Sequence, residues 1–280
     1  MTDGRCWMKN SKIEWTTHTF NPWIGCQEVS PGCGGGQHGA PCYAKTMMDT
    51  RYRKVQWGPH GDRLRTSEAN WKQPSRWAKA ARGSGERPRV FCASLADWLD
   101  NKAPQEWRVD LAALIVATPE LDWLLLTKRP ENYKKLAPWK ETPPNVWLGV
   151  TGENQEYYDR RWKILQVIPA RVRFISYVPA LGPLTDVGSP RPDWIICGGQ
   201  SGRKAIKMDE QWARDIRDIC ATAGVAFFMK QMTNKAPIPD DLMVRQFPAK
   251  GLTDGELVWG AGRDDDRGRV GRCQNLTVTN

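Results

Sequence analysis

Short and almost uniformly apolar runs recur along the chain from about residue 85 onward, and polar turns separate them. Each run is four to six residues long. Runs of this length and composition are typical of parallel strands that are buried on both faces of a sheet. The predicted strands lie at residues 89–93, 123–126, 146–150, 172–175, 194–197 and 225–229.

Helical patterns lie between several of these runs. Residues 104–117 carry apolar side chains at helical spacing after a proline start signal, and residues 154–167 and 209–223 have a similar pattern. Gly224 follows the last of them as a typical C-terminal cap. Alternating strands and helices predict right-handed crossovers in a parallel sheet. With one more strand at residues 19–25, about seven strands favour a full or partial β/α barrel, and an open doubly wound sheet is the alternative.

Two segments fall outside this alternation. Residues 45–87 are polar and rich in Arg, Lys, Trp and Gly. Because a structureless loop of that length is uncommon, we expect helix within it, at residues 67–81. We therefore expect one α/β domain over residues 1–259, with residues 45–87 as a basic insertion. Residues 260–280 are expected to form a mobile, Gly-rich and charged tail.

The charge balance is strongly basic. The 280 residues include 41 Lys and Arg against 31 Asp and Glu, a net charge of +10. Such a surplus fits a polyanionic partner such as nucleic acid, although many basic proteins bind none. Mean hydropathy is −0.60, and no apolar run is long enough to span a membrane. Because the amino terminus lacks the apolar core of a signal peptide, we expect a cytoplasmic location without membrane contact.

Eight cysteines in such a compartment argue against a disulfide framework. Cys6, Cys92, Cys197, Cys220 and Cys273 are scattered along the chain, and we interpret them as small hydrophobic residues. The remaining three lie close together and need another explanation.

Cys26, Cys33 and Cys42 are separated by six and then eight residues, and six glycines lie between residues 25 and 39. Glycine lets the backbone wrap closely around a compact inorganic group. Thiolates are the normal ligands of iron–sulfur clusters, and three ligands for four irons leave one iron open. A zinc site that adds His38 to the three cysteines is the alternative. The loop follows a predicted barrel strand, where barrel enzymes carry out their chemistry, and this position favours the cluster.

A long series of motifs extends this pattern over residues 10–232. The series comprises SKIEWT at residues 11–16, NP at 21–22, GC at 25–26, VSPGC at 29–33, CYA at 42–44, RPRVF at 87–91, SLAD at 94–97, LLLTKRP at 124–130, NVWLGVT at 145–151, GGQSG at 198–202 and FMKQ at 228–231. In order and content it resembles a phage and bacterial family of radical S-adenosylmethionine enzymes.

The sequence departs from that family's pattern at two places. Eight residues separate Cys33 from Cys42 where the family usually has two, which indicates an insertion at residues 34–39. Gln200 stands where the family usually has Glu after the paired glycines. The first departure concerns the geometry of the cysteine loop, and the second concerns any charged role at position 200.

The resemblance implies a partial β/α barrel in which the three cysteines hold a four-iron four-sulfur cluster that binds S-adenosylmethionine. Polar or small residues just after the strands are then the expected cofactor contacts, and helix capping is the alternative for several of them. They are Ser94, Asp97, Thr127, Thr151, Glu153, Ser176, Gly198 and Gly199. Lys128, Arg129 and Lys230 are the expected catalytic cations, suited to a carboxylate or a phosphate. His18 has no evident carboxylate partner, and we expect it to be a packed or surface residue.

We therefore expect a radical enzyme that abstracts hydrogen from a nucleobase or nucleotide. The resemblance implies, more specifically, isomerisation of an amino-acid-decorated thymine in phage DNA, with a flavodoxin- or ferredoxin-type protein as the reducing partner. The Arg-rich stretch at residues 51–65 also suggests a phosphate-bearing substrate. The alternatives are a zinc-stabilised basic module that binds DNA or protein, and a radical enzyme that acts on a peptide or small metabolite.

Overall fold

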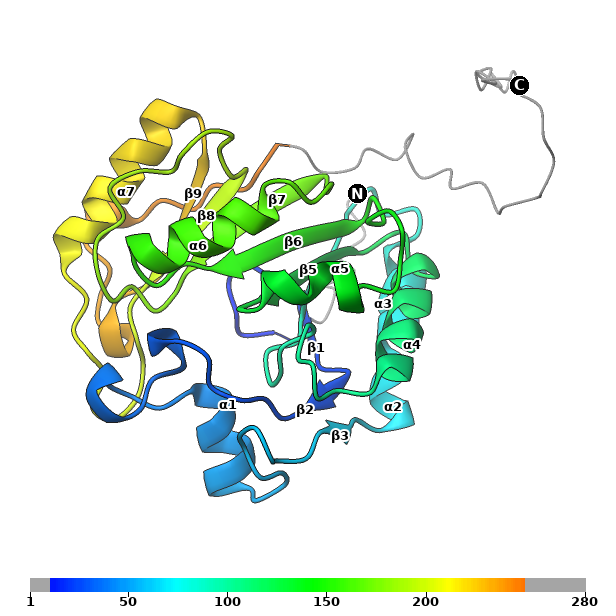
Figure 1. Ribbon diagram of the computed structural model, residues 1–280. Helices are drawn as coiled ribbons and strands as arrows, with labels where there is room; N and C mark the ends of the chain where they lie inside the picture. Colours follow the sequence, from blue (N-terminus) through cyan, green and yellow to red (C-terminus); the bar gives the residue numbers. More distant parts are fainter. Residues whose placement is uncertain (1–10, 250–280) are drawn as a thin grey trace, which may run out of the picture.

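The computed structural model describes residues 11–249, so Cys6, Cys273 and the predicted tail at 260–280 lie outside the described residues. Seven strands form one parallel sheet that curves into an open half-barrel (Figure 1). In spatial order they are β1 (His18–Phe20), β4 (Arg89–Cys92), β5 (Asp122–Thr127), β6 (Val146–Thr151), β7 (Val172–Tyr177), β8 (Trp194–Gly198) and β9 (Ala226–Gln231).

The strands lie side by side in the same order as they occur along the chain. A doubly wound sheet reverses direction at a switch point, and no such reversal occurs in this sheet. Each crossover instead places the next strand on the same side of the last one, as in a barrel. The prediction of a partial β/α barrel is therefore confirmed.

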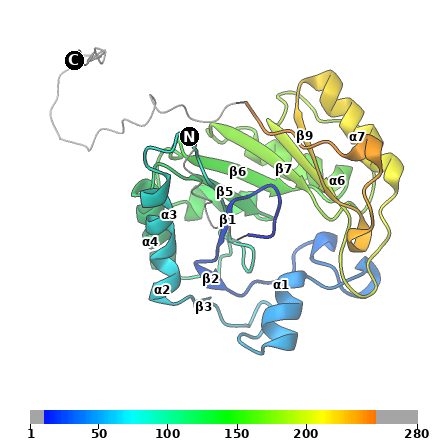
Figure 2. The same cartoon turned by 180° about the vertical axis from the view of Figure 1, so that it is seen from behind.

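Helices cover the outer face of this sheet, as the views from both sides show (Figures 1 and 2). The three helices expected from periodicity are present within one or two residues of their predicted bounds, and Gly224 ends the last one in a left-handed conformation. The predicted helix at 67–81 forms as two short helices, and the side chain of Ser67 caps the first. The helices are α1 (Tyr43–Lys45), α2 (Glu68–Trp71), α3 (Gln73–Ala81), α4 (Gln105–Val116), α5 (Tyr133–Leu136), α6 (Gln155–Leu165) and α7 (Glu210–Ala223).

The predicted strand at 19–25 is split between two sheets. β1 ends at Phe20, and β2 (Trp23–Ile24) pairs in antiparallel fashion with β3 (Leu64–Arg65). The chain changes direction at Asn21, whose side-chain oxygen accepts a hydrogen bond from the Leu95 N–H at 2.8 Å. Pro22, the next residue, has no N–H with which to continue the ladder. The segment before α2 is thereby fastened beside the start of the cysteine loop.

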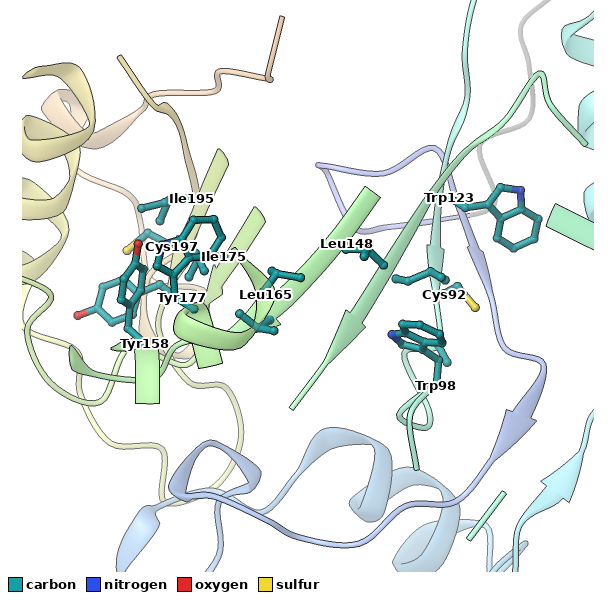
Figure 3. Packing of buried hydrophobic residues seen from close by; sticks show 14 of the residues in the cluster. Cys92, Trp98, Trp123, Leu148, Tyr158, Leu165, Ile175, Tyr177, Ile195 and Cys197 are labelled. Atoms are coloured by element: carbon teal, nitrogen blue, oxygen red, sulfur yellow. The ribbon is translucent and has the colours of Figure 1, made fainter. Parts of the chain in front are cut away.

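The strands are buried on both faces, which explains their uniform apolarity. Toward the helices, residues such as Cys92, Leu148, Ile175 and Cys197 form the larger core (Figure 3). The concave face holds a second, aromatic cluster of Trp15, Phe91, Leu124, Trp147, Val172, Phe174, Trp194, Ile196 and Phe228. None of the helices within residues 11–249 combines the length and apolarity that crossing a bilayer requires.

Candidate functional site

The three clustered cysteines lie in a loop that runs along the carboxyl edge of the sheet, between β2 and α1 (Figure 1). The Gly25 N–H donates to the Leu95 carbonyl at 3.1 Å, which fixes the start of the loop beside the end of β4. Cys26 Sγ accepts a hydrogen bond from Arg129 Nη1 at 3.5 Å, and Cys33 is buried. Cys42 directly precedes α1, and all three thiols are free of disulfides.

The insertion does not drive Cys33 and Cys42 apart, because residues 34–39 form a closed excursion. A Cβ atom on Gly34 would lie 1.7 Å from the carbonyl oxygen of Ala40, so the chain leaves and returns at the same point. The Gly35 N–H also donates to the Gly39 carbonyl at 3.3 Å. The segment resembles a small Ω-loop, whose ends lie close together. The same Cβ atom on Gly34 would lie 3.1 Å from the Pro41 Cα atom, so the residues next to Cys33 and Cys42 lie side by side.

The three thiols of the loop are the donors that either a cluster or a single metal ion would use. Burial raises the pKa of Cys26 to about 12 and also raises that of Cys42, so both thiols stay neutral unless a cation compensates them. Within residues 11–249, no three His, Cys, Asp or Glu side chains converge on a point that one metal ion could occupy. A tetrahedral zinc site with His38 requires such convergence. In a four-iron cluster each thiolate would bind a different iron, which does not require the three thiols to meet at one point.

Asp97 is the centre of a buried network at the ends of β4 and β5. Its Oδ1 accepts hydrogen bonds from Thr127 Oγ1 at 2.7 Å and from the Leu99 N–H at 2.9 Å. Its Oδ2 accepts from the Lys128 N–H and from Arg129 Nη1, both at 2.9 Å. A carboxylate has about four acceptor positions, and here protein donors fill all of them. The expected contact of Asp97 with the cofactor's amino group stays a prediction, and in this structure the carboxylate is bound by the protein's own donors.

Arg129 is bound from several sides as well. Besides Asp97 and Cys26, it donates through Nη2 to the Gln27 carbonyl at 2.8 Å. Its guanidinium thus joins the cysteine loop to the sheet, and these three contacts use only part of its five N–H groups. The catalytic role of Arg129 stays a prediction, and in this structure the counter-charge that its burial demands comes from Asp97.

A second buried network centres on Glu153, after β6. Its Oε2 accepts from Arg161 Nη1 at 2.8 Å, and its Oε1 accepts from Ser30 Oγ at 2.7 Å. Lys128 Nζ lies 3.6 Å from Oε1 and donates to Thr151 Oγ1 at 3.0 Å. Burial would raise the pKa of Glu153, but the charges of Lys128 and Arg161 outweigh it and hold the pKa below its usual value. The carboxylate is therefore ionised and holds the loop that carries Cys33.

The loop passes so close to Glu153 that position 32 requires glycine. A Cβ atom on Gly32 would lie 2.3 Å from Glu153 Oε1. The expected contact of Glu153 with ribose stays a prediction, and in this structure its carboxylate contacts the cysteine loop.

Five of the expected residues lie in one row on the concave face. Side chains alternate along a strand, and register places Thr151 beside Ser176 on the face that carries the aromatic cluster. The same alternation puts Lys128, Gly198 and Lys230 on that face at the same edge. The row of Lys128, Thr151, Ser176, Gly198 and Lys230 therefore faces the interior of the half-barrel, and we call it the strand-end row.

Lys230 differs from the other cation of the strand-end row. The structure gives its ammonium no hydrogen bond and no ion pair among residues 11–249, whereas Lys128 contacts both Thr151 and Glu153. Burial, with a smaller contribution from the charge of Lys235, lowers the pKa of Lys230 to about 8. Lys230 is thus a partly buried cation without a counter-charge among the described residues.

Gly199 and Ser94, two other residues expected to contact the cofactor, contact other parts of the protein in this structure. A Cβ atom on Gly199 would lie 2.5 Å from the Thr233 nitrogen, so the glycine lets the chain after β9 pass close by. Ser94 Oγ accepts a hydrogen bond from Asn21 Nδ2 at 3.1 Å, which joins the ends of β1 and β4. The structure thus brings Ser94 to Asn21.

Sequence reasoning missed two residues of the Glu153 network, Ser30 and Arg161. Arg161 had a detectable signal, because it shares the buried face of α6 with Tyr158, Trp162 and Leu165 at helical spacing. An arginine in such a position needs a buried partner. Ser30 had no comparable signal, since only the fold brings it to Glu153.

The Arg-rich stretch at 51–65 is only partly a free surface. Arg51, Arg53 and Lys54 are exposed. Arg63 is buried and pairs with buried Asp100 at 2.6 Å. The later part of the predicted basic surface is therefore structural.

Arg65 and His18 also pack against aromatic rings. Arg65 lies over the ring of Trp71 at 4.0 Å and pairs with Asp110. The His18 ring stacks on Trp77 with centroids 4.2 Å apart, and burial lowers its pKa to about 4. His18 is therefore a neutral, packed residue on the helix side of the sheet.

Comparison with known proteins gives the following likenesses. The fold is similar to a solved structure of a spore photoproduct lyase mutant with a dinucleoside spore photoproduct, at 12% sequence identity and a TM-score of 0.45. The match covers 75% of this chain and 62% of that one, so the chain spans less than two thirds of that structure. We found no match among curated proteins. A family model described as "Protein of unknown function (DUF5131)" matches residues 10–258, and the chain belongs to that family.

Proposed function

We propose that the protein is a radical S-adenosylmethionine enzyme in which Cys26, Cys33 and Cys42 hold a four-iron four-sulfur cluster. One observation carries the proposal: three free thiols of a single loop lie at the carboxyl edge of a sequentially ordered parallel half-barrel. Barrel enzymes carry out their chemistry at this edge. When bound, such a cluster supplies the electron that splits S-adenosylmethionine into methionine and a 5′-deoxyadenosyl radical.

The chain's own residues hold and enclose the reacting groups. Arg129 and Glu153 fix the two halves of the cysteine loop on the sheet. The aromatic cluster closes the concave face below the strand-end row and keeps water from entering there. In this proposal, Thr151 and Ser176 offer hydroxyl groups to the polar parts of the cofactor, and Gly198 lets a ligand approach the backbone.

For the substrate, we propose a nucleobase in DNA, and more specifically an amino-acid-decorated thymine of phage DNA that is isomerised. The net charge of +10 and the exposed Arg51, Arg53 and Lys54 support a polyanionic partner. Exposed Tyr43 and Tyr52 lie in the same segment and offer rings for stacking. A base in duplex DNA would have to leave the stack to reach the concave face.

Lys230 is the group that we propose for an anionic part of this substrate, because its ammonium has no counter-charge among the described residues. A carboxylate or a phosphate would fit it equally well. Lys230 therefore also suits the second candidate, a radical enzyme that acts on a peptide or small metabolite. A flavodoxin- or ferredoxin-type protein is the proposed source of the electron.

Anaerobic reconstitution tests the core of the proposal. Protein purified and reconstituted with iron and sulfide should hold about four irons and four acid-labile sulfides per chain. With a reductant and S-adenosylmethionine it should release 5′-deoxyadenosine. Colourless protein with one zinc per chain would instead support a zinc-stabilised binding module.

A separate experiment tests the nucleic-acid partner. Replacing Arg51, Arg53 and Lys54 with Glu should weaken DNA binding by about tenfold or more and reduce its dependence on salt. The matched control replaces Arg76, Lys79 and Lys163, three exposed cations on α3 and α6, with Glu. Equal losses in both triple variants would indicate a general charge effect. Binding that ignores salt and both variants would favour a free nucleoside, a peptide or a small metabolite.

A further inference from the structure

The side chain of Gln200, directly after the paired glycines at the end of β8, is buried against the excursion of the cysteine loop. Its Oε1 accepts hydrogen bonds from the Ala40 N–H at 3.0 Å and from the Ile206 N–H at 2.9 Å. Its Nε2 donates to the His38 carbonyl at 3.0 Å and to the Ala40 carbonyl at 3.1 Å. The two donors and the two acceptor positions of the amide are thus all satisfied.

Only an amide can make this set of contacts. A carboxylate at position 200 would still accept from the two N–H groups, but it would face the carbonyl oxygens of His38 and Ala40 without a proton to donate. An apolar side chain would leave buried backbone groups unpaired, which is costly. Gln200 and the end of the 34–39 excursion therefore meet in one set of hydrogen bonds.

The contact lies two residues before a cysteine. Ala40 is held through both its N–H and its carbonyl group, and Pro41, which has a fixed φ, links it to Cys42. Gly39 has φ +83°, and a Cβ atom on it would lie 2.3 Å from Gln200 Oε1. Gln200 therefore determines where the chain returns from the excursion and begins its approach to Cys42.

We propose that Gln200 is a positioning residue that closes the 34–39 excursion and thereby holds Cys42 near Cys33. Gln200 acts through the backbone of residues 38–40 and touches none of the three thiols. Its effect on metal binding rests on the proposed function, because it requires that Cys42 is a cluster ligand. The closure of the loop does not, so the two parts can be tested separately.

Hydrogen exchange on the metal-free protein tests the closure. In Q200A and Q200E, amides of residues 34–42 should exchange about tenfold faster or more, because a buried hydrogen-bonded contact is lost. The matched control is Q155E, since the Gln155 amide similarly holds the backbone of Thr185 and Asp186 and makes none of its hydrogen bonds among residues 11–249 to the cysteine loop. Unchanged exchange in both Gln200 variants would overturn the proposal, whatever metal the protein binds.

The iron content after reconstitution tests the consequence for Cys42. Q200E should lose iron relative to the parent, and Q155E should not. Deletion of residues 34–39 leaves Cys33-Ala40-Pro41-Cys42, with two residues between the cysteines, and removes the segment that Gln200 closes. In that background Q200E should cost no further iron.

The deletion background also separates a failure of the Gln200 proposal from a failure of the proposed function. Equal loss of iron from Q200E with and without the excursion would overturn the proposed link between Gln200 and the insertion. Absence of iron from the parent itself would instead contradict the proposed function, while the exchange result would still decide whether Gln200 closes the loop.

Discussion

The two sides of the half-barrel's carboxyl edge differ in how their charges are balanced. At the ends of β4, β5 and β6, buried Asp97 pairs with Arg129, and buried Glu153 pairs with Arg161 and lies near Lys128. At the end of β9, Lys230 has no acidic partner among residues 11–249. The acidic and basic side chains named on the first side balance one another, whereas the cation on the second side is left without an acidic partner among the described residues.

This difference indicates a division of work. Buried ion pairs fix geometry, but a charge that is already paired and hydrogen-bonded has little left to offer a ligand. The β4–β6 side therefore serves as a scaffold for the cysteine loop. The β9 side carries a cation whose balance a ligand's negative charge would complete, so we expect the substrate to be recognised there.

The largest expected effect is on the loop that the scaffold holds. Replacing Cys26, Cys33 or Cys42 with Ala should abolish iron binding and the brown thiolate-to-iron absorption, because each thiolate would bind a different iron. Cys220→Ala is the control, since this thiol is buried in the helix-side core. Iron and sulfide analysis gives the result, and full iron content in any of the three variants would remove that cysteine from the ligand set.

The next effect concerns the stability of the scaffold. Asp97→Ala should lower the free energy of unfolding by about 3–5 kcal/mol, because it leaves the buried Arg129 charge unpaired. Glu68→Gln, which removes an exposed pair with Lys72, should cost less than about 1 kcal/mol. Urea unfolding of the metal-free variants measures both. Similar small losses would mean that the β4–β6 side is no more rigid than the surface.

Replacing Lys230 should change the free energy of unfolding in the opposite direction. Its pKa is lowered from 10.5 to about 8, so the unfolded chain binds the proton more tightly than the folded one. The charged lysine therefore destabilises the fold at neutral pH, and the penalty disappears as the pH rises from about 8 to 10.5. Lys230→Met should be more stable than the parent by about 1–3 kcal/mol at pH 7.

The same variant sharpens the comparison of the two sides. The difference in unfolding free energy between parent and Lys230→Met should shrink across that alkaline window. Lys128→Met should instead destabilise the fold, because Lys128 offsets the charge of Glu153. A Lys230→Met variant that is less stable at every pH would mean that Lys230 already has an anionic partner, and the contrast would fail.

Much of the fold follows from local pattern. The uniform apolar runs became β4 to β9 because both faces of this sheet are covered, and the helices began and ended near their capping residues. The order of the strands did not follow, because barrel and doubly wound sheets use the same right-handed crossover. The split at Asn21 and Pro22 also depended on remote partners, among them Leu95.

The positions of the strand-end residues were predictable from the sequence, and their pairing was less so. The rule that polar residues follow parallel strands brought Lys128, Thr151, Ser176 and Lys230 to one row. It did not say which of them were already paired. Pairing depends on segments far apart in sequence, as when Ser30 reaches Glu153. Only the three-dimensional structure therefore distinguishes the strand-end residues that are already paired from those that are open to a ligand.

The smallest expected effect is at His38, which lies within the cysteine loop but outside the proposed ligand set. The contact that the structure gives it with Gln200 uses the backbone carbonyl, which any side chain at this position retains. His38→Ala should therefore keep the parent's iron content, its absorption spectrum and its slow exchange at residues 34–42. Cys42→Ala, measured in parallel, shows what loss of a ligand looks like. A loss of iron from His38→Ala as large as that from Cys42→Ala would make the imidazole a ligand. The site would then be the three-cysteine, one-histidine alternative.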